Sequence, residues 1–170
     1  MSYFTISYLF KADYRDYKHY PLKGWYVDVE ASKYGLGILE DENVDFWRIS
    51  ANYRTYSPIS DRFYWALGLY SSFQPDELPP YPLNTGLGYG RYFVRGYEYY
   101  VIEGYWQSLA KTTLKYALVP QTNTQLKKIK SEKFSKFYYA FYLNLFSDIG
   151  YSKSWSQLTP TGLNNRLLYS

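Results

Sequence analysis

The sequence predicts an all-β protein, namely a segment of an antiparallel transmembrane β-barrel. Hydrophobic and polar residues alternate with a period of two along most of the chain, which is typical of strands rather than helices. The alternating segments are about 10 residues long, enough for a tilted strand to cross a bilayer and longer than most strands of globular sheets. Tyr and Trp gather near the segment ends, as in the interfacial girdles of membrane barrels.

The first three expected strands cover residues 3–13, 25–34 and 45–56, and each has an apolar face opposite a polar one. Charged residues such as Asp28, Glu30 and Arg48 occupy the polar faces of the second and third strands. The apolar faces consist of Phe4, Ile6, Tyr8 and Phe10, then Trp25, Val27, Val29 and Ala31, then Trp47, Ile49, Ala51 and Tyr53.

The other three expected strands cover residues 62–72, 109–120 and 137–151. Residues 164–169 resemble the start of one more strand. The apolar faces of these three strands consist of Phe63, Trp65, Leu67 and Leu69, then Thr112, Leu114, Tyr116 and Leu118, then Phe137, Tyr139, Phe141, Leu143 and Leu145.

The connections differ in length, as expected for a barrel with short turns at one rim and long loops at the other. Residues 56–61 form a short turn that contains proline. Residues 73–106 form a long loop rich in Gly and Pro, which we expect to be extracellular and functional. Residues 121–136 carry five lysines and are expected to form a solvated basic turn.

The composition narrows the range of functions. Tyr occurs 24 times and aromatic residues make up 23% of the chain, which is too many for a disordered protein. There is no Cys, which excludes a disulfide framework, a thiolate zinc site and a cysteine nucleophile. His19 is the one histidine, so sites built from several histidines are excluded as well. We therefore expect no catalytic residues, no metal site and no cofactor.

The long loop contains the tetrapeptide Val94-Arg95-Gly96-Tyr97. This motif resembles the V-R-G-[FY] sequence in the sixth extracellular loop of the BamA/TamA outer-membrane insertase family, which belongs to the bacterial surface antigen superfamily. Three further matches follow the order of the family and span nearly the whole chain. They are the turn motif Asp13, Arg15, Asp16, Pro21 and Gly24, the strand end Leu118-Val119-Pro120, and the strand motif Phe146, Asp148 and Gly150.

A contact between Arg95 and Asp148 is also implied by this resemblance. A guanidinium group is a rigid fork that can hold a carboxylate through two bonds, so an arginine is well suited to anchor a loop inside a barrel. The alternation places Asp148 on the polar face of its strand, where such a loop would lie. We expect the pair to brace the barrel interior, with Gly96 allowing the loop to fold tightly.

The resemblance implies a part of an outer-membrane protein assembly factor, which inserts and folds β-barrel proteins in the bacterial outer membrane. Its partners would be outer-membrane lipid, client β-barrel proteins and accessory assembly subunits, and its barrel would have about 16 strands. Relative to the family, residues 1–170 lack the POTRA repeats, the first strands, the last strands and a signal peptide. We therefore expect a single, partial barrel domain that is not an enzyme.

Two alternatives stay open. The chain could be a complete small outer-membrane barrel of about eight strands with a pore or binding role, if residues 92–106 add two strands. More remotely, aromatic residues interleaved with Arg and Lys could stack the bases of single-stranded nucleic acid in a soluble β-sheet module. The net charge of only +4 argues against the second alternative, so no nucleic-acid partner is expected.

Overall fold

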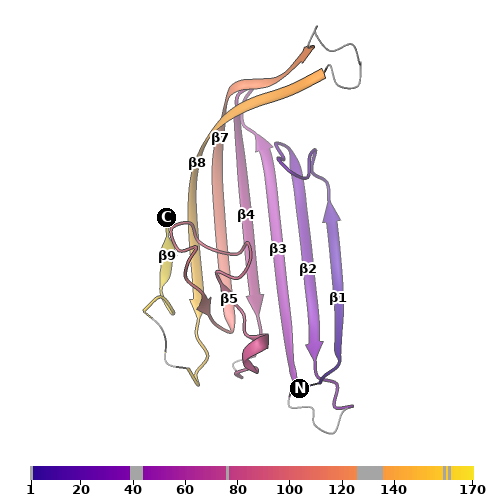
Figure 1. The fold of residues 1–170 in the computed structure, drawn as a ribbon, viewed down its shortest axis with the longest axis vertical. Coiled ribbons are helices and arrows are strands. Elements are labelled where there is room, and N and C mark those ends of the chain that lie inside the picture. The colour runs from indigo at the N-terminus through magenta and orange to yellow at the C-terminus, as the bar shows by residue number, and fades with distance from the viewer. Residues whose placement is uncertain (1, 39–43, 76, 126–135, 159, 161) are drawn as a thin grey trace.

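The computed structural model describes residues 2–38, 44–75, 77–125, 136–158, 160 and 162–170. Seven antiparallel strands form one twisted sheet in the order β1-β2-β3-β4-β7-β8-β9 (Figure 1). These strands are β1 (Thr5–Asp13), β2 (Gly24–Tyr34), β3 (Phe46–Pro58), β4 (Phe63–Phe73), β7 (Trp106–Gln125), β8 (Lys136–Lys153) and β9 (Leu167–Tyr169). The described residues include no helix long and apolar enough to cross a membrane.

The prediction of an all-β, antiparallel fold is confirmed, and all six expected strands form. The segment expected to begin one more strand forms β9, which pairs with β8. The prediction that the strand ends at Leu118-Val119-Pro120 is wrong, because β7 continues to Gln125. Two register shifts between Ala117 and Thr122 accommodate Pro120, which has no N–H to donate to a neighbouring strand. Residues 126–135 of the expected basic turn lie outside the described residues.

The sheet is open, with β1 and β9 at its two edges. The alternative of a small eight-stranded barrel needed residues 92–106 to add two strands. Instead, residues 74–105 form a loop that contains the 3-10 helix η1 (Tyr81–Leu83) and a two-stranded ribbon of β5 (Gly86–Leu87) and β6 (Ile102–Glu103). Ile102 and Glu103 thus pair with Leu87 and Gly86 inside the loop, and residues 92–106 add no two strands to the main sheet.

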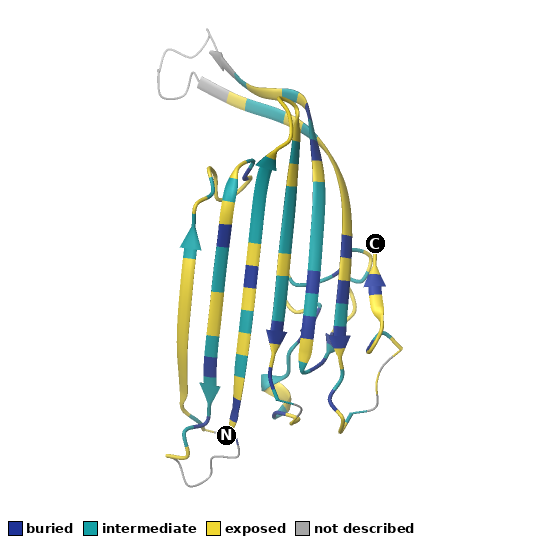
Figure 2. Cartoon of the chain, turned by 180° about the vertical axis from the view of Figure 1, so that it is seen from behind, coloured by how far each residue is buried: buried dark blue, intermediate teal, exposed yellow. Residues whose placement is uncertain are grey.

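The two faces of the sheet differ sharply in polarity. Paired residues share a face, and successive residues of a strand alternate between faces. The inner face carries most of the charged residues of the strands, among them Asp28, Arg48, Lys111 and Asp148, and the loop of residues 74–105 folds back over part of it. The outer face, which is turned toward the viewer in Figure 2, carries exposed large apolar side chains, including Ile6, Tyr8, Phe10, Trp47, Ile49, Trp65, Leu69, Leu145 and Ile149.

We call the two ends of the sheet the loop end and the turn end, after the connections that lie there. At the loop end, residues 74–105 join β4 to β7. At the turn end, residues 14–23 join β1 to β2 and residues 59–62 join β3 to β4.

Candidate functional site

Loop residues 92–95 cross the inner face from β4 to β8. The ring of Tyr92 stacks on that of Tyr70 of β4, with the centroids 3.7 Å apart and the planes 10° from parallel. The ring of Phe93 lies 4.2 Å from the ammonium group of Lys111 on β7. Successive loop residues therefore contact successive strands, which places the next two residues over β8.

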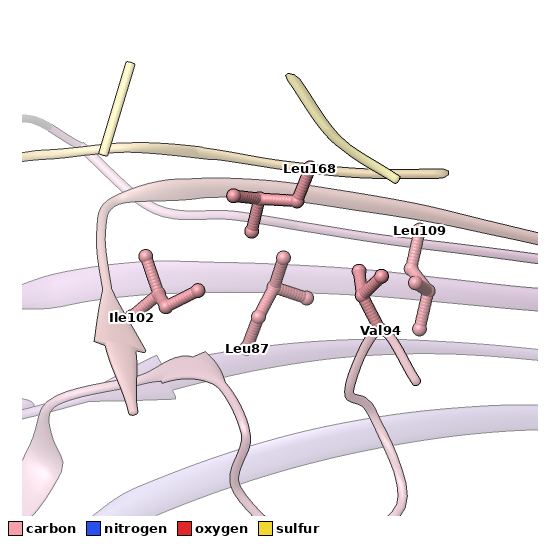
Figure 3. Close-up of a cluster of buried hydrophobic side chains, with 5 residues drawn as sticks. All are labelled: Leu87, Val94, Ile102, Leu109 and Leu168. Atoms are coloured by element: carbon pink, nitrogen blue, oxygen red, sulfur yellow. The ribbon is translucent and has the colours of Figure 1, made fainter. Parts of the chain in front are cut away.

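Val94 anchors the loop in a small hydrophobic cluster. Its side chain is 1% exposed and packs with Leu87, Ile102, Leu109 and Leu168, whose side chains point toward one another (Figure 3). Gly150 provides the space, because a Cβ atom there would overlap Cγ2 of Val94. The glycine of the strand motif and the valine of the loop motif thus fit each other sterically.

Arg95 binds Asp148 through two groups. Its backbone N–H donates to Oδ2 at 3.2 Å, and its guanidinium Nη1 donates to Oδ1 at 3.1 Å. Asp148 is fully buried, whereas about a third of the Arg95 side chain is exposed. The guanidinium also lies 4.1 Å from the ring centroid of Phe146. The structure therefore brings the loop motif and all three residues of the strand motif together.

Asp148 has a second cationic partner that the sequence did not reveal. Lys111 is directly opposite Asp148 in the β7–β8 register, and its Nζ lies 3.6 Å from Oδ2. The alternation put Lys111 on the polar face, but nothing in the sequence fixed the register of the two strands. The buried carboxylate is thus held between a cation from the loop and a cation from the sheet.

The loop turns sharply just after Arg95. Gly96 has a φ of +86°, a region that favours glycine, and the N–H of Tyr97 donates to the carbonyl of Val94 at 3.0 Å. The N–H of Gly96 donates to the Glu98 carboxylate at 2.9 Å. Hydrogen bonds from the backbone N–H groups of Glu98 and Gly96 lower the pKa of the Glu98 carboxyl group. Tyr97 packs against the edge of the hydrophobic cluster.

The turn motif lies at the turn end, away from the loop motif. Arg15 donates two hydrogen bonds to the Asp13 carboxylate, from Nε to Oδ1 at 2.8 Å and from Nη2 to Oδ2 at 2.8 Å. The hydrogen bonds that Arg15 donates to the Asp13 carboxylate raise the pKa of Arg15 above its usual value. The Asp16 carboxylate accepts a hydrogen bond from the backbone N–H of Leu22 at 3.1 Å and so closes the turn. These contacts stabilise the turn internally.

This turn is also attached to β7 and β8. The carbonyl of the buried Pro21 accepts a hydrogen bond from Nζ of Lys115 on β7 at 3.1 Å. The Tyr20 hydroxyl donates to the side chain of Asn144 on β8 at 3.3 Å. Gly24 has a φ of +104° and approaches the carbonyl of Tyr14 so closely that a Cβ atom would overlap it. The loop and the turn therefore rest on the same two strands.

No known protein family, no curated protein and no solved structure matches the chain. Among the described residues, no group of three or more His, Asp and Glu side chains is close enough together to hold a metal ion. The loop and the strand motif form a site in which charge is neutralised and side chains are packed. Such an arrangement holds a loop against a sheet.

Proposed function

We propose that this chain is part of a bacterial outer-membrane assembly factor of the BamA/TamA type, which inserts and folds β-barrel proteins. The observation that carries the proposal is the contact between Arg95 and Asp148, at 3.1 Å, with Asp148 fully buried. This is the contact that the resemblance to the family implies. Val94 against Gly150 and Arg95 over Phe146 support it with two further pairs between the same motifs.

A membrane location is supported by the outer face. Trp47 on β3 is 54% exposed and Leu145 on β8 is 71% exposed. Strands β1 to β4 are 9 to 13 residues long. Strands of about this length cross a bilayer when tilted, and lipid is a favourable solvent for such side chains. The outward apolar and inward polar pattern is that of a transmembrane barrel.

A closed barrel larger than this sheet is supported by the open edges. Unpaired backbone groups at β1 and β9 are costly in lipid, which lacks hydrogen-bonding partners for them. We propose that further strands pair with both edges and close a barrel of about 16 strands. The loop of residues 74–105 then lies in the lumen and braces β4, β7 and β8.

In this proposal the protein makes and breaks no covalent bond. Its partners are outer-membrane lipid, unfolded client barrels and accessory assembly subunits. The ion pair between Arg95 and Asp148 holds the loop against β8, so that this part of the barrel wall stays rigid while a client is inserted elsewhere.

The proposal is tested by a folding assay in lipid vesicles. A small outer-membrane barrel, unfolded in urea, is diluted into empty vesicles or into vesicles that carry the complete barrel of which this chain is a part, and its folding is followed by protease resistance. We expect faster folding with the protein, and a rate near that of empty vesicles with Asp148→Ala. Equal rates in all three samples would contradict the proposed insertase function.

A further inference from the structure

We propose that the outer face at the loop end binds an anionic phospholipid through Lys33 and Lys153. This inference rests on the proposed membrane location and adds the chemistry of the lipid. Of the side chains that the structure describes on the outer face of the strands, these two are the charged ones, and both are cations. Both lie at the loop end, where β2 and β8 finish.

Each lysine lies beside aromatic rings. The ammonium group of Lys33 is 5.5 Å from the ring centroid of Trp47, its direct partner on β3. The ammonium group of Lys153 is 5.5 Å from the ring centroid of Tyr105, and Lys153 pairs with Trp106. Lysine stems lie along apolar surface and place the charge at the level of the lipid headgroups, where Trp and Tyr also gather. The two cations are thus at the depth of the phosphate groups.

A hollow next to Lys33 fits an acyl chain. It has a volume of about 590 Å³ and opens on the outer face between β1, β2 and β3. Ile6, Tyr8, Ala31 and Trp47 supply its apolar walls. An anionic lipid can therefore place its phosphate on Lys33 and its acyl chain in the hollow. A free phosphate ion lacks the acyl chain, and a zwitterionic lipid lacks the net negative charge.

Asp45 is the competitor for Lys33. The two side chains form an ion pair, but the Asp45 side chain is 80% exposed, so water and salt screen it. A lipid phosphate held by its own chain in the hollow displaces this carboxylate. Removing the carboxylate with Asp45→Asn should then strengthen lipid binding, whereas removing Lys33 should weaken it.

The test is flotation of the protein with vesicles of phosphatidylcholine, alone or mixed with phosphatidylglycerol. We expect about fivefold tighter association with the anionic vesicles per lysine, lost stepwise in Lys33→Gln and Lys33→Gln/Lys153→Gln. Asp45→Asn should increase it. Lys11→Gln is the matched control, because it removes the same charge from the inner face, beside Tyr26, and should leave the preference unchanged.

The outcomes separate this inference from the proposed function. Equal association with both vesicle types, or equal loss in Lys11→Gln and Lys33→Gln, would overturn the lipid site and leave the membrane location intact. Failure to associate with either vesicle type would overturn both.

Discussion

At the residue scale, the loop is held by one buried charge, one small residue and several rings. These contacts are physically different, so they should respond differently to substitution. Losing the partners of Asp148 should cost the most free energy, because a buried carboxylate without a partner is far more costly than a lost ring contact.

Gly150→Ala should release the loop by steric overlap with Val94. We expect a loss of about 1 to 3 kcal/mol in the free energy of unfolding, since overpacking forces neighbouring atoms to move. Urea unfolding in detergent micelles measures this. Val94→Ala/Gly150→Ala should recover much of the loss, and Gly68→Ala, which meets only ordinary contacts on the same face, should cost little. No recovery in the double variant would contradict the account.

Asp148→Ala and Arg95→Ala should not be equivalent. Without Asp148, Arg95 and Lys111 face each other unpaired, at a cost of about 3 to 5 kcal/mol. In Arg95→Ala, Lys111 still neutralises Asp148 and the backbone N–H of residue 95 still donates to it, so the loss should be roughly 1 to 2 kcal/mol from the guanidinium hydrogen bond. A double-mutant cycle on unfolding free energies should also show strong coupling. Equal single effects that simply add would refute this arrangement.

At the element scale, β7 and β8 carry both the loop and the turn. Lys111 and Asp148 hold the loop, while Lys115 and Asn144, each four residues closer to the turn end, hold the turn. The hairpin of β7 and β8 therefore holds both the loop of residues 74–105 and the turn of residues 14–23 against the inner face.

Gly24→Ala should loosen the turn of residues 14–23. A side chain there must adopt a φ of +104° and overlap the Tyr14 carbonyl, which together cost more than about 1.4 kcal/mol, a factor of ten. Hydrogen exchange of the Tyr14 amide, bonded to Trp25 at 2.9 Å, should accelerate by at least roughly that factor. Gly90→Ala shares the positive φ but has open space, so it should leave Tyr14 unaffected.

The elements themselves were predictable from the sequence, and their contacts were not. Period-two alternation identifies the strands around Trp25, Trp47 and Trp65, because one face is apolar throughout. It does not predict that β7 extends past Pro120, since residues 121–125 are all polar and show no alternation. It also does not fix which residue faces Asp148. Lys111 and Tyr70 therefore could not be assigned to the site, although Arg95 could be through the family motif.

At the scale of the whole molecule, the sheet presents one polar face that is partly covered by its own loop and one apolar face that is exposed along its length. In water such a surface favours association, and the open edges at β1 and β9 add to it. A sheet of this kind is stable when lipid covers one face and other strands complete the edges.

The chain should self-associate in buffer without detergent and become monodisperse in detergent micelles. Sedimentation velocity in the two conditions measures the change. A detergent-free monomer would instead favour a soluble β-sheet protein.

The membrane orientation of the sheet is tested most directly by single-cysteine scanning, because the chain has no cysteine of its own. Positions 47–56 of β3 are replaced one at a time, spin-labelled in lipid vesicles, and probed with oxygen and a water-soluble quencher. We predict high oxygen accessibility at Ile49, Ala51 and Tyr53, alternating with low values at Arg48, Ser50 and Asn52. Uniform access of the water-soluble quencher along the strand would contradict a lipid-facing outer surface.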